Sequence, residues 1–137
     1  MMRTQIVQPG QASKLLRQAL RGNGVFSAVS GLVLVLAARP LATFMGLAWP
    51  LALTGIGLVL LPYAAFLFWV TAQAEIDQRA AKTAVILDAL WVVGSILLLL
   101  TDWLNLSAAG NWTVALLAEA VLTFCILQAV GLRRSRA

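Results

Sequence analysis

The sequence predicts an all-α integral membrane protein, in which four transmembrane helices form one bundle and both termini lie in the cytoplasm. Three observations predict this class. Of the 137 residues, 61% are hydrophobic and only 11% are charged, whereas soluble domains are about half apolar and a quarter charged. The apolar residues gather in four long segments. The basic residues gather at one set of segment ends.

The four apolar segments predict spans at about residues 19–38, 51–71, 84–101 and 112–132 of a single domain, 1–137. Each is close to the roughly 20 residues with which a helix crosses a hydrocarbon layer of about 30 Å. Runs such as LVLVLAA lack the alternation of membrane β-strands, which favours helices. Pro50 suits the first turn of the second helix. The connections 39–46, 73–83 and 102–111 are expected to be short loops.

The basic residues predict the orientation. Four spans put both termini and the 73–83 connection on one side of the membrane. That side holds nine of the ten basic residues, and the other side holds Arg39 alone. The positive-inside rule makes the basic side cytoplasmic, in a bacterial inner membrane. At about 13–21, a basic amphipathic lead with Lys14, Arg17 and Arg21 either continues into the first span or lies on the inner surface.

Tryptophans mark the opposite boundary. Trp49, Trp103 and Trp112 fall at the predicted non-cytoplasmic ends of spans. Indole rings favour the headgroup level, where the ring and its N–H are both accommodated. We therefore expect these three residues to be interface anchors.

An acidic residue inside each of the last two spans carries most of the functional information. Charged groups are costly at membrane depth and tend to pair or to face protein. Asp88 shares a helical face with Trp91 and Ser95, and the first span offers a polar stripe at a similar depth. We predict an inner polar layer of Asp88, Asn23 and Ser27, with Arg21 or Arg17 as counter-ion; the remaining candidates on these stripes are Ser30, Trp91 and Ser95. The layer either fixes helix register or serves a substrate or proton.

Glu119 is predicted about 10 Å from Asp88 in depth. The two acids are therefore not expected to form a carboxylate pair. They could be stations of a proton or cation path, or Glu119 could bond a loop or a neighbouring subunit. Gln128 lies nine residues after Glu119, half a turn around the helix. This spacing points to a second protein surface, unless Gln128 reaches the headgroups.

Several chemistries are excluded or disfavoured. The chain has no histidine and one cysteine, Cys125, so an imidazole base, a disulfide within the chain and a thiolate cluster cannot occur. We expect no metal and no cofactor. The positive charge lies at the ends of apolar segments, which indicates lipid rather than nucleic acid as the partner. Two acids about 10 Å apart disfavour concerted acid–base catalysis.

The stretch Leu16–Leu47, with N-x-x-F-S-x-x-S-G near its start, is followed by an acid–tryptophan pair in DALWVVGS at 88–95. This pattern resembles a type of small four-span bacterial inner-membrane protein. The resemblance covers most of the chain and implies architecture only, because no established activity is associated with it.

Two functions from different classes fit these observations. The first is a non-enzymatic structural, accessory or assembly partner that forms a homo-oligomer or joins a larger membrane complex. The second is a small proton- or cation-coupled transporter or channel that uses Asp88 and Glu119.

Overall fold

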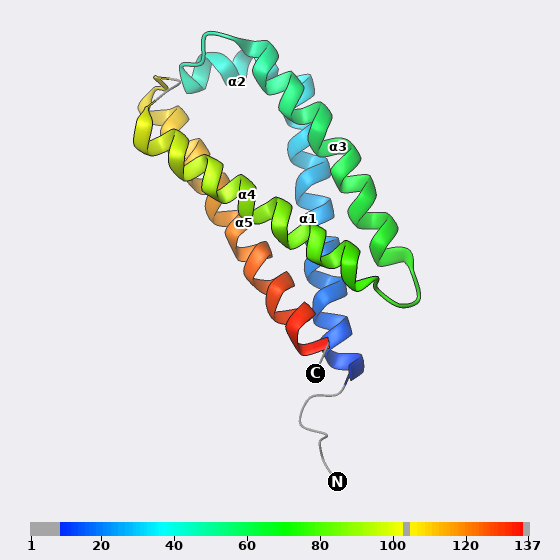
Figure 1. Ribbon diagram of the computed structural model, residues 1–137. Helices are drawn as coiled ribbons and strands as arrows, with labels where there is room; N and C mark the ends of the chain where they lie inside the picture. Colours follow the sequence, from blue (N-terminus) through cyan, green and yellow to red (C-terminus); the bar gives the residue numbers. More distant parts are fainter. Residues whose placement is uncertain (1–8, 103–104, 136–137) are drawn as a thin grey trace.

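The computed structural model describes the backbone of residues 9–102 and 105–135, and the side chains of 14–102 and 105–134. This part of the chain is all-α, with no strand. Four of its helices are long and one is short, arranged as in Figure 1. In chain order they are α1 (Pro9–Leu36), α2 (Ala38–Met45), α3 (Pro50–Ala72), α4 (Gln78–Thr101) and α5 (Ala108–Ser135).

Four long apolar helices cover the four predicted segments. Each one contains an apolar stretch long enough to cross a membrane: Lys14–Leu36, Pro50–Ala72, Gln78–Thr101 and Ala108–Arg134. The basic lead is continuous with the first of them, because α1 already begins at Pro9. The fixed φ of Pro9 and its missing N–H suit a first helical turn. The helices thus extend past most of the predicted span limits.

The 39–46 connection was expected to be a loop, and this prediction is wrong. It forms α2, which ends where Gly46 adopts a left-handed φ of 73°. The Leu47 N–H then donates to the carbonyl of Ala42 at 2.8 Å. The carbonyl of Met45 accepts from the Ser107 N–H at 2.9 Å, which ties the end of α2 to the segment before α5. These bonds satisfy the last carbonyls of the short helix α2. Arg39 makes α2 too polar to be recognised from the sequence as part of a span.

Helix α1 lies at the centre of the bundle, between α3 and α5, and α4 packs mainly against α5 (Figure 1). Close approach of α1 and α3 depends on Gly31 and Gly57. A Cβ atom on Gly57 would lie 2.7 Å from the carbonyl oxygen of Gly31. Helices α3 and α4 touch at few positions, although they are joined by a short loop. Contacts elsewhere must therefore hold α4 in register with α3.

The buried core is small and the outer surface is apolar. One cluster lies at the end of the bundle where α1 begins and α5 ends, around Leu16, Leu67 and Ala81. The other joins α2 to α3, around Ala42 and Leu53. Many large apolar side chains point outwards; Val59 is 68% exposed and Leu100 78% exposed. Such a surface is unusual for a soluble monomer and suits contact with lipid, so the chain is a multi-pass membrane protein.

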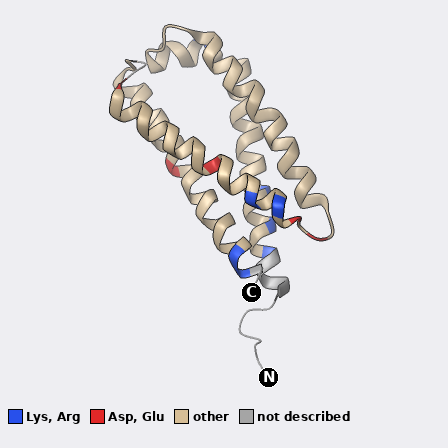
Figure 2. Cartoon of the chain, viewed as in Figure 1, with Lys and Arg blue, Asp and Glu red and all other residues tan. Residues whose placement is uncertain are grey.

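Lysine and arginine gather at the end of the bundle where α1 begins and α5 ends (Figure 2). We call this the basic end and the opposite one the α2 end. Among the described residues the basic end holds Lys14, Arg17, Arg21, Arg79, Lys82, Arg133 and Arg134. Arg39 lies in α2. Arg3 and Arg136, which were also predicted on the cytoplasmic side, lie outside the described residues.

Candidate functional site: a buried polar cluster

Each of the four long helices contributes one polar side chain to a cluster inside the bundle. The members are Asn23 of α1, Tyr63 of α3, Asp88 of α4 and Gln128 of α5, and we call them the polar cluster. Asn23 is 1% exposed, Asp88 4% and Gln128 0%. Tyr63 is half-buried. A polar group buried in an apolar environment is costly unless it is hydrogen-bonded, so the partners of these side chains decide what the cluster can do.

The carboxylate of Asp88 is the central acceptor. Its Oδ2 accepts from Asn23 Nδ2 at 2.7 Å and from Gln128 Nε2 at 2.7 Å. Its Oδ1 accepts from the Tyr63 hydroxyl at 2.8 Å. A carboxylate has about four acceptor positions, and three of them are thus used by donors from three other helices. Asp88 thereby joins α4 to α1, α3 and α5 at one depth.

The neighbours of Asp88 also bond to one another. Asn23 Nδ2 donates to Gln128 Oε1 at 2.9 Å, so Asn23, Asp88 and Gln128 form a closed triangle of hydrogen bonds. Ser27, also buried, donates to Asn23 Oδ1 at 3.4 Å. The Tyr63 hydroxyl lies 3.3 Å from the carbonyl oxygen of Ala84, which offers it a second acceptor. The predicted association of Asp88 with Asn23 and Ser27 is therefore present.

The predicted counter-ion is absent from the cluster. Arg17 instead donates to the carbonyl oxygens of Thr71, of Gln73 at 2.8 Å and of Ala74 at 2.9 Å. Thr71 lies in the last turn of α3, and Gln73 and Ala74 follow the helix directly. Carbonyls at a helix end have no partner within the helix, so they attract the guanidinium more directly than a carboxylate two turns deeper. Arg21 is exposed. Within the described part of the chain, the carboxylate of Asp88 accepts hydrogen bonds from neutral donors only.

Within the described part of the chain, the other predicted members form no hydrogen bond with the cluster. Ser30, Trp91 and Ser95 are half-buried. The Trp91 Nε1 atom is buried and has no hydrogen-bond partner among the described residues. Trp91 follows Asp88 by about one turn of α4, so it lies closer than Asp88 to the end of α4 at Thr101.

The sequence pattern gave no assignment for Tyr63, and it left open whether Glu119 or Gln128 faces the core of the bundle. Gln128 is the one that is fully buried in the cluster. The half-turn spacing from Glu119 was the available signal, because it requires one of these two residues to face the core when the other faces out. Tyr63 is the only tyrosine of the chain and lies mid-span, which was a weaker signal for a buried hydroxyl.

Glu119 lies outside the cluster. It is exposed, on the face of α5 opposite Gln128. Because Gln128 is nine residues further along, Glu119 lies about 13 Å from the level of Asp88 along the helix. The prediction that these acids form no carboxylate pair is confirmed.

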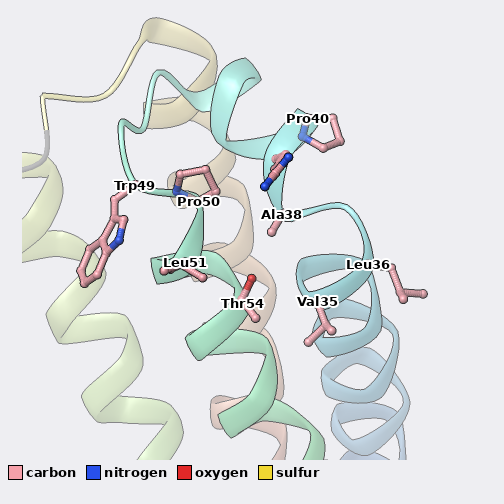
Figure 3. A pocket seen from close by; sticks show the side chains of 9 residues that line it. Val35, Leu36, Ala38, Pro40, Trp49, Pro50, Leu51 and Thr54 are labelled. Atoms are coloured by element: carbon pink, nitrogen blue, oxygen red, sulfur yellow. The ribbon is translucent and has the colours of Figure 1, made fainter.

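The α2 end carries the predicted anchors and a surface groove. Trp49 is 64% exposed and Trp112 68% exposed, while Trp103 lies outside the described residues. A groove of about 650 Å³ lies between the end of α1, α2 and the start of α3 (Figure 3). Most of its lining side chains are exposed, and none belongs to the polar cluster; they are Val35, Leu36, Ala38, Arg39, Pro40, Trp49, Pro50, Leu51 and Thr54.

Comparisons of the chain with known protein families, curated proteins and solved structures find no match. A function is therefore inferred from the geometry of the four long helices and of the polar cluster.

Proposed function

We propose that this chain is a non-enzymatic structural or accessory protein of a bacterial inner membrane, with both termini in the cytoplasm. Its role is to present a rigid four-span unit to a membrane partner. The observation that carries the proposal is the bonding of the polar cluster: an intramembrane carboxylate whose donors are fixed side chains of the three other long helices.

This bonding favours a structural role over ion binding. A cation site needs oxygen ligands turned towards the ion, whereas the groups around Asp88 turn N–H and O–H donors towards it. The other acid, Glu119, lies about 13 Å away along α5 and on the outer face, so the two acids share no path inside the bundle. Interhelical hydrogen bonds of this kind average about 0.6 kcal/mol in membranes. They therefore fix the register of the helices more than they add stability.

The orientation is supported by the distribution of charge. Seven described basic residues lie at the basic end, and only Arg39 lies in α2. Juxtamembrane basic residues are retained in the cytoplasm and attract anionic lipid. A cytoplasmic basic end would also place Trp49 and Trp112 at the outer headgroup level.

A flux assay tests the proposal against transport. The purified protein is reconstituted in liposomes with an enclosed pH-sensitive dye, and a potassium gradient with valinomycin drives proton entry. Wild type, Asp88→Asn and Glu119→Gln are compared with protein-free liposomes at equal dye loading. The proposal expects all four to give the same leak. Proton flux in the wild type that Asp88→Asn abolishes, while its unfolding in detergent stays unchanged, would refute the structural role and establish a transporter.

A further inference from the structure

The groove at the α2 end lies between three helices, away from the polar cluster. Val35 and Leu36 at the end of α1 form one side, and Leu51 and Thr54 at the start of α3 form the other (Figure 3). Arg39, in the first turn of α2, also lines it. Its volume of about 650 Å³ falls within the roughly 300–1,000 Å³ of small-molecule sites. The groove is thus large enough to hold a small molecule.

Arg39 gives this groove a positive charge that nothing in its lining neutralises. Its side chain is exposed, and no described residue accepts a hydrogen bond from its guanidinium. None of the described residues that line the groove is acidic. The first turns of α2 and α3, which also line it, have no side-chain cap, so the positive ends of two helix dipoles add to the charge of the guanidinium. An arginine stays protonated at physiological pH, so an anion is the complementary ligand.

Apolar side chains continue from the groove along the membrane-spanning helices. Leu36 is 81% exposed and Leu51 65% exposed, one on each side of the groove. Between them α1 and α3 approach closely, since a Cβ atom on Gly57 would lie 2.8 Å from Val35 Cγ2. The apolar part of a ligand must therefore lie along the outer side chains rather than deep between the helices. The ligand that fits is amphipathic, with an anionic group at Arg39 and hydrocarbon beside Leu36 and Leu51.

A phospholipid has this composition and is present at this depth. Trp49 also lines the groove, and an exposed tryptophan at the end of a span is expected at the headgroup level. Phospholipids present their phosphate groups at that level, and a guanidinium can bind a phosphate through two parallel hydrogen bonds. A zwitterionic lipid also carries an ammonium group, for which the described lining offers no carboxylate. The groove therefore favours phosphatidylglycerol, whose headgroup beyond the phosphate is uncharged.

We propose that the groove at the α2 end binds one phosphatidylglycerol molecule, with its phosphate on Arg39 and its acyl chains along Leu36 and Leu51. This inference rests on the proposed membrane insertion, which puts the α2 end at a headgroup level. It holds for either orientation of the chain, and it is independent of the polar cluster.

Photo-cross-linking separates the groove from the basic end, which also attracts anionic lipid. The full chain is placed in phosphatidylcholine vesicles that contain a trace of phosphatidylglycerol with a photoactivatable acyl chain, and adducts are mapped by peptide mass spectrometry. Wild type is expected to give adducts at Leu36 and Leu51. Replacing part of the phosphatidylcholine with unlabelled phosphatidylglycerol should displace them, whereas the same amount of phosphatidylethanolamine should not. Adducts spread evenly along the exposed side chains of all helices, or displaced equally by both lipids, would overturn the proposal.

Variants separate the charge of the groove from its shape. Arg39→Gln is expected to lower the displaceable adducts about tenfold, which corresponds to about 1.4 kcal/mol. Thr54→Phe keeps the charge but fills the groove, and should lower them as well. Arg79→Gln is the matched control, since Arg79 is an exposed arginine in the first turn of α4 at the basic end, and it should leave the groove adducts unchanged. A wild-type yield from Arg39→Gln, or an equal loss from Arg79→Gln, would overturn the site.

Two further measurements identify the source of the phosphate and test the premise. Glycerol 3-phosphate added to the buffer is expected to leave the groove adducts in place, because it lacks the acyl chains. Displacement by this compound would assign the groove to a soluble phosphate ester and overturn the lipid. Alkaline extraction of native membranes is read separately, because release of the protein would refute membrane insertion rather than the choice of ligand.

Discussion

Replacing Asp88 with leucine removes the acceptor of three hydrogen bonds that reach α4 from α1, α3 and α5. At the membrane average of about 0.6 kcal/mol for each bond, the loss is about 2 kcal/mol, and at the largest measured values it is about 5 kcal/mol. The upper range applies where the orphaned Asn23 and Gln128 amides stay buried without new partners. We expect the free energy of unfolding of Asp88→Leu to fall within this interval.

Asp88→Asn is expected to cost far less, because the cluster can reorganise around an amide. The new Oδ1 can accept from both Asn23 and Gln128. The new Nδ2 can donate to the oxygen of Tyr63, whose hydroxyl then turns to the carbonyl of Ala84, 3.3 Å away in the wild type. Every donor keeps an acceptor, so the expected loss is below about 1 kcal/mol.

The assay is reversible unfolding in mixed micelles, followed by tryptophan fluorescence and circular dichroism. Leu90→Ala is the matched control on the same helix; Leu90 is 62% exposed, and its loss should lie within about 0.5 kcal/mol of zero. Asp88→Leu that unfolds like the wild type would refute the register role of the cluster. Asp88→Asn that is as unstable as Asp88→Leu would refute the reorganisation through Tyr63.

Three further predictions address other contacts. Arg17→Ala should lower the free energy of unfolding by about 1–2 kcal/mol, because it removes a charged donor from the end of α3. Arg17→Lys should restore only part of this free energy, because an ammonium lacks the planar fork with which a guanidinium bonds several carbonyls. An Arg17→Ala protein as stable as the wild type would contradict the capping role of Arg17. Gly131→Ala should lower the free energy of unfolding by about 1–3 kcal/mol in the same assay, because the new Cβ would lie 2.9 Å from the Leu16 Cα. Gly94→Ala should leave it unchanged, because a Cβ there would have nothing within 4 Å. Equal losses of stability in the two variants would argue against the close packing of α1 and α5. A periplasm-active reporter fused to the C-terminus should stay inactive, and strong activity there would reverse the orientation.

The candidate site could be predicted in part. Asp88, Asn23 and Ser27 were recognisable because polar side chains in apolar spans at similar depth are expected to meet. Tyr63 and Gln128 were not assigned to the same place, since a helical period gives the face of a residue but not which face looks inward. Arg17 was a plausible counter-ion by depth alone. Its actual partners are carbonyls at and just after the end of α3, beginning 54 residues further along the chain.

The four apolar segments can be recognised from the amino-acid sequence alone, because each is a local matter of apolar length against bilayer thickness. The sequence also shows that few polar groups are available inside them. Which of these groups meet follows from the packing of the bundle, since it depends on the rotation and crossing of helices whose residues are far apart in the chain. The close passage of Gly57 against Gly31 is part of that packing, which buries Gln128 and leaves Glu119 facing outwards on the same helix.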